Sequence, residues 1–343
     1  MLYSNLIRPL LFKLPAETAH DITIRQLELL QNSYMGRELI KLLSGHVESN
    51  PVQVMGLNFR HPVGLAAGLD KDAKVIRGLF QMGFSHIEVG TLTPKGQPGN
   101  DKPRLFRLKE DDALINRMGF NNEGSIAASR RLKKRDPNWG VVGGNVGRNK
   151  ITNNENAIDD YIASMSHLRD HVDYFTVNIS SPNTPGLREL QQEEVLKNLL
   201  TRISDDNSKS FKPRPLAVKI SPDLSKQEVQ SISRLAVTCG FNGIIGTNTT
   251  VNRTGLKTKA NRIEDAGSGG LSGRPLARHS TDVVAWIKEA VGDSAAVIGV
   301  GGVFNAQDVI DKRNAGADLV QIYSGFVYNG PSMLNNIQEA WIK

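Results

Sequence analysis

The chain has 343 residues, of which 39% are hydrophobic and 22% charged, so it has enough apolar material for a core and too little charge bias for global disorder. Lysine and arginine exceed aspartate and glutamate by seven, which favours anionic ligands; the densest basic run (130–135) has no interleaved aromatic residues to stack bases, so we expect no nucleic-acid partner. The single cysteine, Cys239, excludes an intramolecular disulfide and a cysteine zinc or iron–sulfur site, and it favours a reducing compartment.

The first 45 residues read as a helical segment of their own. Apolar residues recur at helical spacing in residues 2–14, where Pro9 predicts a kink, and in two further stretches before Gly45. No stretch approaches the roughly 18 uninterrupted apolar residues of a transmembrane helix, and no signal-peptide pattern is present, so we expect a chain that neither spans a membrane nor is exported. Residues 1–45 therefore predict an amphipathic helical extension. Composition alone favours core packing over a membrane face for such a stripe.

The remaining residues, 46–343, alternate short apolar runs with longer amphipathic ones. Two short runs around residues 55–56 predict a hairpin before the main domain. Strand candidates are residues 62–68, 86–90, 141–146, 173–178, 215–220, 242–247, 296–301 and 318–323. Helical patterns lie near residues 71–82, 122–135, 155–170, 190–205, 225–239, 277–291, 305–314 and 331–342. Eight strand–helix units predict an α/β fold, a (β/α)₈ TIM barrel with a small N-terminal extension.

The carboxyl ends of barrel strands are where catalytic residues gather. Two connections that leave such ends, residues 91–121 and 248–276, are too long for simple loops. The polar or glycine residues at the predicted ends are Asp70, Lys71, Thr91, Asn145, Asn178, Lys219, Thr247, Asn248, Gly301, Gly302, Tyr323 and Ser324. This set has few carboxylates and no histidine or cysteine, which argues against a metal site and against glycosidase chemistry. Its amides and lysines suit a planar, oxygen-rich anion such as a flavin or a carboxylated ring.

Glycines follow the last two strands. Residues 299–302 read GVGG and residues 324–325 read SG, and barrels often seat a phosphate on backbone amides in these two loops. Such glycines could also serve tight turns alone, but their position after strands seven and eight favours phosphate binding.

Several ordered strings near the strand ends point to one family. They are AAGLDKD at residues 66–72, PRLFR at 103–107, NRMGF at 116–120, NISSPNTPGLR at 178–188, TNTT at 247–250, GGLSGRPL at 269–276, IGVGG at 298–302 and QIYSGF at 321–326. On these strings, and nearly end to end, the chain resembles the class 2 dihydroorotate dehydrogenases, flavin enzymes of pyrimidine synthesis. The resemblance implies oxidation of (S)-dihydroorotate to orotate, with hydride passing to FMN and a membrane quinone reoxidising the flavin.

The resemblance also implies two sets of binding residues. For FMN they are Ala67, Gly68, Leu69, Asp70, Lys71, Thr91, Asn145, Asn178, Lys219, Thr247, Gly273, Gly302, Tyr323 and Ser324. For the substrate they are Lys71, Asn116, Arg117, Met118, Gly119, Phe120, Asn178, Asn183, Asn248 and Thr249. Lys71 would neutralise the orotate carboxylate, and the asparagines would bind ring carbonyls and N–H groups.

By the same resemblance, Ser181 is the base that removes the C5 proton of dihydroorotate while hydride leaves C6 for flavin N5. Class 1 members have a cysteine at this position, whereas Cys239 falls at the predicted end of a barrel helix. A hydroxyl alone is a poor base, so we expect a water or Thr184 to carry the proton away and the loop to exclude solvent.

The resemblance finally gives the extension a role, because class 2 members rest such a segment on a membrane and admit quinone through it. It implies peripheral binding to the cytoplasmic side of the cell membrane, with His20, Arg107 and Tyr323 lining a quinone tunnel. Two other interpretations stay open: another FMN barrel oxidoreductase with a soluble acceptor, and a flavin-binding barrel without catalytic activity.

Overall fold

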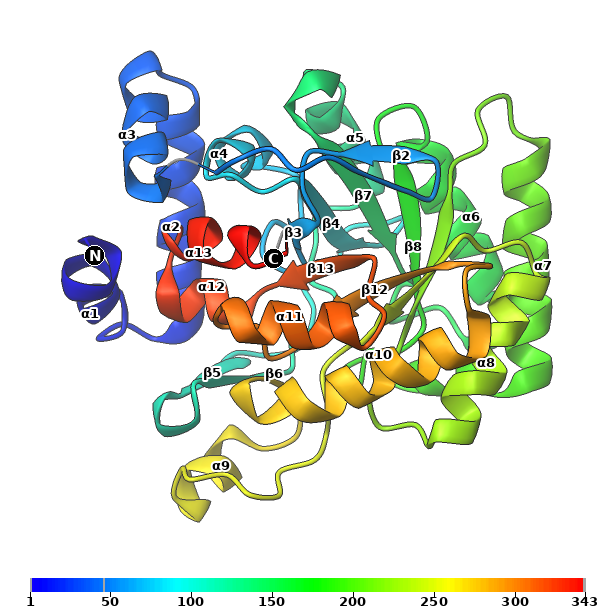
Figure 1. Cartoon of the computed structure of the whole chain (residues 1–343). Coiled ribbons are helices and arrows are strands. Elements are labelled where there is room, and N and C mark those ends of the chain that lie inside the picture. Colours follow the sequence, from blue (N-terminus) through cyan, green and yellow to red (C-terminus); the bar gives the residue numbers. More distant parts are fainter. Residues whose placement is uncertain (1, 46, 342–343) are drawn as a thin grey trace.

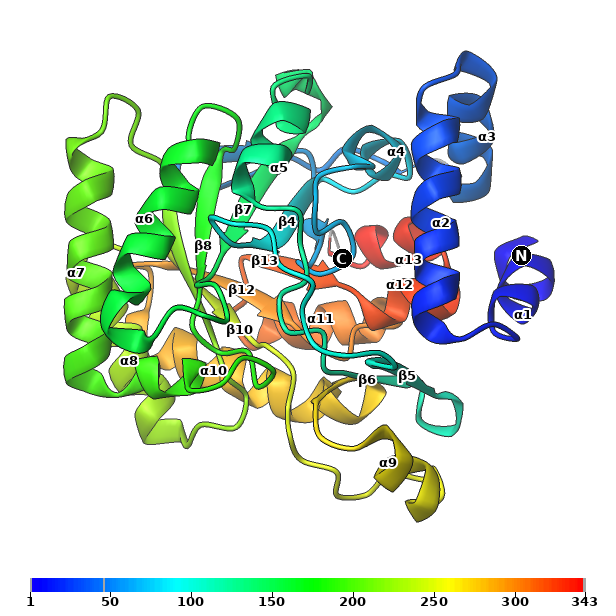
Figure 2. The same ribbon diagram turned by 180° about the vertical axis from the view of Figure 1, so that it is seen from behind.

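The computed structural model describes residues 2–45 and 47–341. Eight parallel strands close into a barrel that helices surround, with the helical extension at one side (Figures 1 and 2). Around the barrel the strands are β10 (Gly243–Gly246), β12 (Ala296–Val300), β13 (Leu319–Ile322), β3 (Val63–Leu65), β4 (His86–Leu92), β7 (Val141–Val146), β8 (Tyr174–Asn178) and β9 (Leu216–Ile220). All eight predicted strands and the TIM barrel are thus confirmed. The strands are buried on both faces, which explains their nearly continuous apolar sequences.

Each predicted barrel helix has a counterpart. They are α4 (Ile76–Gln81), α5 (Ser125–Leu132), α6 (Ala157–Leu168), α7 (Glu193–Lys209), α8 (Lys226–Thr238), α10 (Ala277–Val291), α11 (Ala306–Asn314) and α13 (Met333–Glu339). Residue 342, the last of the predicted helical residues, lies outside the described residues. α4 begins later than expected because the Asp70 carboxylate accepts the backbone N–H groups of Lys74 and Val75, at 2.7 and 2.8 Å, and so holds a turn. Cys239 follows α8 directly, as predicted.

A three-stranded antiparallel sheet at the barrel mouth was not predicted. It consists of β5 (Leu105–Leu108), β6 (Ala113–Asn116) and β11 (Gly270–Gly273), in the order β11-β6-β5. Both long connections contribute strands to it, and their pairing partners lie about 150 residues apart, which local patterns do not reveal. Further short elements are η2 (Lys109–Asp111), η3 (Pro137–Trp139), η4 (Asn154–Asn156), η5 (Leu187–Gln191), η6 (Arg274–Leu276), α9 (Ala260–Ala266) and α12 (Ser324–Asn329).

The extension consists of short helices that pack against the barrel. They are the π-helical turn η1 (Tyr3–Ile7), α1 (Arg8–Leu11), α2 (Ala16–Gln31) and α3 (Tyr34–Ser44), followed by the predicted hairpin of β1 (Val52–Val54) and β2 (Leu57–Phe59). Pro9 is the second residue of α1, which follows the π-helical turn directly, so the predicted interruption coincides with a change of helical type. Gln31 attaches α2 to the barrel: its Nε2 donates to the Lys74 carbonyl at 2.7 Å, and its Oε1 accepts from Gly78 N of α4 at 3.0 Å.

The boundary that we expect at residue 46 falls on a residue outside the described ranges, so the division into residues 1–45 and 46–343 stays a prediction. None of the helices in the described part of the chain has both the length and the apolar run needed to cross a bilayer.

Candidate active site

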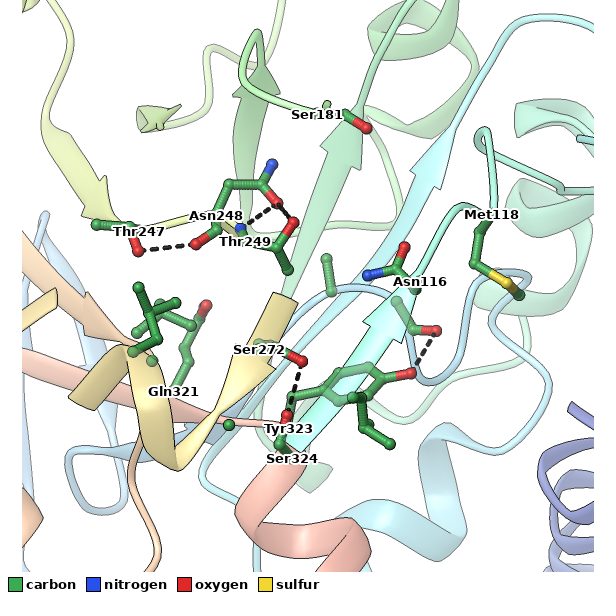
Figure 3. Close-up of a pocket in the computed structure, with 18 of the residues that line it drawn as sticks. Asn116, Met118, Ser181, Thr247, Asn248, Thr249, Ser272, Gln321, Tyr323 and Ser324 are labelled. Atoms are coloured by element: carbon green, nitrogen blue, oxygen red, sulfur yellow. Dashed lines mark hydrogen bonds between the residues drawn. The ribbon is translucent and has the colours of Figure 1, made fainter. Parts of the chain in front are cut away.

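One cavity lies at the carboxyl ends of the barrel strands, and most of the predicted site residues line it (Figure 3). Those residues are Ala67, Gly68, Lys71, Thr91, Asn116, Met118, Gly119, Phe120, Asn178, Ser181, Asn183, Lys219, Thr247, Asn248, Thr249, Gly273, Gly302, Tyr323 and Ser324. They lie at or just after the carboxyl ends of seven barrel strands, all but β7, and in the two long connections, so only the closed barrel brings them together.

Ser181 lies in the loop that follows β8, and only 6% of it is exposed. Its Oγ accepts the backbone N–H of Asn183 at 3.2 Å. Arg188 ties the loop down, because its Nε donates to the Ser180 carbonyl at 3.2 Å and its Nη1 pairs with Asp223 at 2.9 Å. The Thr184 hydroxyl is buried and has no hydrogen-bond partner among the described residues. The loop therefore holds the Ser181 hydroxyl against the cavity, and three residues later it carries the Thr184 hydroxyl, which has no partner among the described residues.

Four asparagines and a lysine surround this end of the cavity. Asn183 Nδ2 donates to Asn116 Oδ1 at 3.1 Å, and Asn248 Nδ2 donates to Asn178 Oδ1 at 3.3 Å. Burial lowers the pKa of Lys71, while the carboxylates of Asp72 and Glu17 oppose that shift. Amides that are paired with one another and one desolvated ammonium suit a small ring with a carboxylate.

The other end of the cavity fits a flavin. Lys219 is buried with its ammonium free of protein hydrogen bonds in the described structure, and burial lowers its pKa. Gln321 also lines the cavity, and its buried Oε1 has no partner among the described residues. An isoalloxazine edge alternates carbonyl acceptors with an N–H donor, so a free cation and a free acceptor meet both requirements. Sequence reasoning missed Gln321, although a glutamine inside the apolar run of β13 is itself a signal.

The predicted phosphate seat is formed by backbone and hydroxyls. Ser324 Oγ donates to Ser272 Oγ at 2.9 Å, and both residues line the cavity beside Gly301 and Gly302 (Figure 3). Gly302 has a φ of 72°, and a Cβ there would collide with the backbone of Ala277. Only glycine satisfies this position, because α10 begins directly against it.

Four predicted site residues do not line the cavity. The Asp70 carboxylate is used in the turn before α4, and Leu69 lines a second cavity instead. The Arg117 guanidinium donates to the Pro103 carbonyl at 2.9 Å and to the Ala266 carbonyl, so it braces the two long connections. Asn145 lies beneath the cavity floor, where its Oδ1 accepts from Thr91 Oγ1 at 2.6 Å.

The second cavity, of about 290 Å³, lies between the extension and the barrel. Its lining is mostly apolar, and it shares His20 and Tyr323 with the main cavity. His20 Nε2 lies 2.9 Å from the Leu69 carbonyl, and Arg107 donates to the Leu14 carbonyl at 2.9 Å with its guanidinium over the Phe12 ring. Burial raises the pKa of Tyr323 to about 12, so this phenol stays protonated. All three residues predicted for quinone thus face this apolar space.

Comparisons with known proteins agree with this geometry. The family model described as "Dihydroorotate dehydrogenase" matches residues 50–342. Proteins named dihydroorotate dehydrogenase (quinone) are 47% identical in Christiangramia forsetii, over 98% of both chains, and 45% identical in Chromobacterium violaceum, over 99% of this chain and 97% of that one.

Among solved structures, ligand-free dihydroorotate dehydrogenase from Eimeria tenella superimposes with a TM-score of 0.81 at 35% identity, over 89% of this chain and 92% of that chain. The same enzyme in complex with ferulenol gives 0.79 at 34% identity, over 90% of each chain. From these matches, the chain belongs to the dihydroorotate dehydrogenase family.

Proposed function

We propose that this protein oxidises (S)-dihydroorotate to orotate in pyrimidine biosynthesis and delivers the electrons to a membrane quinone through bound FMN. The observation that carries this proposal is the pair of adjoining cavities: one carries amides and lysines that suit a carboxylated ring, the other is almost wholly apolar, and Tyr323 and His20 belong to both. A soluble electron acceptor would need no apolar cavity beneath an amphipathic extension.

The residues that would hold FMN are those of the main cavity between Lys219 and the glycine loops. Lys219 and Gln321 would bind the polar edge of the ring system, and the backbone of Gly301 and Gly302 with Ser324 would bind the phosphate. When bound, FMN supplies a hydride acceptor that can later release its electrons to a quinone.

The substrate would lie against the asparagines. The ammonium of Lys71 would neutralise the substrate carboxylate, which is worth more in this desolvated position than in water. Amides of Asn116, Asn183 and Asn248 would hold the ring carbonyls and N–H groups. These contacts would fix the ring so that its C5 proton faces Ser181.

Ser181 would act as the base. Its Oγ accepts the C5 proton and must pass its own proton onward, because a hydroxyl does not hold two protons at neutral pH. The Thr184 hydroxyl, buried without a partner, is available to take part in that relay, directly or through a water. The bonds of Arg188 to Ser180 and Asp223 would keep the loop closed and water excluded.

Replacing Ser181 tests this role. In Ser181→Ala, we expect flavin reduction by dihydroorotate to slow by about 10²- to 10⁴-fold, the usual range for a lost general base. Stopped-flow absorbance of the oxidised flavin measures the rate directly, and reoxidation by quinone should be unchanged in the same variant. A Ser181→Ala protein that is reduced at the wild-type rate would refute the assignment.

The extension would bind the membrane surface peripherally, on the cytoplasmic side, and open the apolar cavity to quinone. Several large apolar side chains of α2 and α3 stand in solvent: Leu29 is 68% exposed, Met35 82% and Leu42 80%. Burying such side chains in lipid stabilises binding by about 1.5–3 kcal/mol each. Nothing in the described protein covers them.

Charged substitutions on this surface test the membrane role. We expect Met35→Asp/Leu42→Asp to reduce sedimentation with lipid vesicles and turnover with a long-chain quinone by at least tenfold, while turnover with a soluble dye acceptor stays the same. The matched control is Phe211→Asp, an exposed apolar residue just after α7, which lies on the opposite side of the barrel (Figure 1). Equal loss in the control would point to a general effect of added charge and against the proposed face.

A further inference from the structure

A buried carboxylate beneath the cavity floor has no place in the mechanism above. Glu88 lies on β4 with no exposed surface, inside the barrel. Its Oε1 accepts from Asn145 Nδ2 at 2.7 Å. Its Oε2 accepts from Thr176 Oγ1 at 3.0 Å, from Gln321 Nε2 at 3.0 Å and from Tyr174 OH at 3.2 Å. Four donors around one side chain are what an ionised carboxylate requires, since it can only accept.

This carboxylate dictates which way the neighbouring amides face. Asn145 must turn its Nδ2 toward Glu88, so its Oδ1 points away and accepts from Thr91 Oγ1 at 2.6 Å and from Asn178 Nδ2 at 3.3 Å. Asn178 Nδ2 also donates to Thr91 Oγ1 at 2.9 Å. The orientation of Asn145 therefore fixes that of Asn178, whose Oδ1 faces the loop after β8 and accepts from the backbone N–H of Ser180 at 3.3 Å. Asn178 Oδ1 then accepts from Asn248 Nδ2, which belongs to the substrate wall.

A second branch starts from the same carboxylate. Gln321 Nε2 donates to Glu88, so the Oε1 of the same amide is the atom that has no partner beside the cavity. An amide flip would instead bring the Gln321 oxygen against the carboxylate, and two acceptors in contact in a low-dielectric interior repel strongly. The orientation of Gln321 is therefore as fixed as that of Asn145.

Glu88 also balances charge under the flavin site. The ammonium of Lys219 on β9 is buried without a protein hydrogen bond in the described residues, and the negative charge of Glu88 counteracts the lowering of its pKa by burial. The other groups around Glu88 are neutral: Tyr174 and Thr176 of β8, Asn145 of β7 and Gln321 of β13. Glu88 and Lys219 thus form a separated charge pair across the barrel interior.

We propose that Glu88 is a positioning residue for the flavin: it holds the amide of Gln321 in the one orientation that presents a free acceptor oxygen to the ring, it fixes Asn145 and through it Asn178 beneath the ring, and its charge disfavours electron uptake by the ring above it. This inference rests on the proposed function, since it takes the main cavity to hold FMN. It assigns a role in binding and in redox poise to a side chain that touches neither ligand.

The decisive variant is Glu88→Gln, which keeps the shape, removes the charge and places an amide N–H among four donors. We expect FMN to bind about 10- to 100-fold more weakly in titrations of the flavin-free protein followed by FMN fluorescence, the equivalent of one lost hydrogen bond to a charged group. We also expect the midpoint potential to rise, and a tenfold difference in affinity between the two redox states corresponds to about 30 mV. A purely structural role would lower stability and leave the potential of the bound flavin unchanged.

Two matched controls remove a donor without touching the charge; Thr176→Val leaves every amide contact in place, whereas Tyr174→Phe also removes the long 3.4 Å contact from Gln321 Nε2 to its hydroxyl. Tyr174→Phe and Thr176→Val each delete one hydrogen bond to the same carboxylate, and both should bind FMN within about twofold of wild type with an unchanged potential. If Glu88→Gln behaves like these controls, the inference fails while the proposed function stands. If wild-type protein binds no FMN or is not reduced by dihydroorotate, the proposed function fails first.

A double variant keeps the test informative if Glu88→Gln does not fold. In Glu88→Gln/Asn145→Asp, the new amide N–H can donate to the new carboxylate, and Thr91 and Asn178 can still donate to its other oxygen. Every donor then has an acceptor again, and the negative charge has moved from position 88 to position 145. We expect this pair to restore folding and FMN binding to within tenfold of wild type. A double variant no better than the single one would show that Glu88 serves only the core and would overturn the proposal.

Discussion

Lys312, on α11 and far from the mechanism, allows a quantitative prediction of stability against pH. The residue is 1% exposed, and its Nζ donates to Ser280 Oγ at 2.7 Å and to Thr281 Oγ1 at 2.9 Å on α10. Burial lowers its pKa from 10.5 to about 7, and the carboxylates of Asp308, Asp311 and Asp282 only partly offset this. At about 1.4 kcal/mol per pH unit, the buried charge costs about 5 kcal/mol below pH 7.

The sign follows from proton counts. Below pH 7 the lysine is charged in both states, so the folded protein carries the whole cost. Between pH 7 and 10.5 the unfolded chain holds more protons than the folded one, so stability rises with pH and the cost at pH 9 is about 2 kcal/mol. Lys312→Met removes the charge but also two hydrogen bonds worth about 1 kcal/mol each. We therefore expect it to stabilise the protein by about 3 kcal/mol at pH 6 and by about zero at pH 9.

Urea unfolding followed by tryptophan fluorescence at pH 6, 7.5 and 9 measures this difference. The control is Lys197→Met, which replaces an exposed lysine on α7 and should change stability little at any of these pH values. The same stability change at pH 6 and pH 9 in Lys312→Met, or a loss at pH 6, would refute the reasoning.

Two further variants test the cofactor seat and the attachment of the extension. Gly302→Ala places a Cβ against the Ala277 backbone at a φ of 72°, so we expect at least tenfold weaker FMN binding by fluorescence titration, and normal binding would contradict the assigned seat. Glu17 of α2 accepts hydrogen bonds from Arg104 at 2.8 and 3.1 Å. Burial raises the pKa of the Glu17 carboxyl, but the bonds from Arg104 and the charge of Lys102 lower it by more, so the pKa is lowered overall. The lowered pKa means that the carboxylate adds stability at neutral pH, and this contribution shrinks as the pH falls below the ordinary glutamate range. Glu17→Gln should therefore cost up to about 1 kcal/mol at pH 7 and less at pH 3 in urea unfolding, and equal costs at both would exclude the charge as the cause.

The barrel was predictable because each of its strands is a short run of apolar residues that is buried on both faces, such as LAVKI of β9. The mouth sheet was not, because β6 reads as part of a loop until β11 pairs with it from another connection. The same limit applies to the site. Ser181, Lys71 and Asn248 lie at strand ends or in the loops that follow them, whereas Glu88 and Gln321 lie inside strands that are buried along their whole length, so their position alone assigns them to the core. A polar residue in the middle of a fully apolar run marks them, and only the closed barrel shows what they face.

The mouth sheet couples the two long connections to each other. β6 is hydrogen-bonded to β5 on one side and to β11 on the other, so Asn116 at the end of β6 pairs with Gly270, and Gly273 pairs with Ala113. Insertions in one long connection would shift the register of the other, and with it the pyrimidine wall and the phosphate cradle together. Chimeras that exchange residues 91–121 with a relative should therefore lose flavin unless residues 248–276 are exchanged with them.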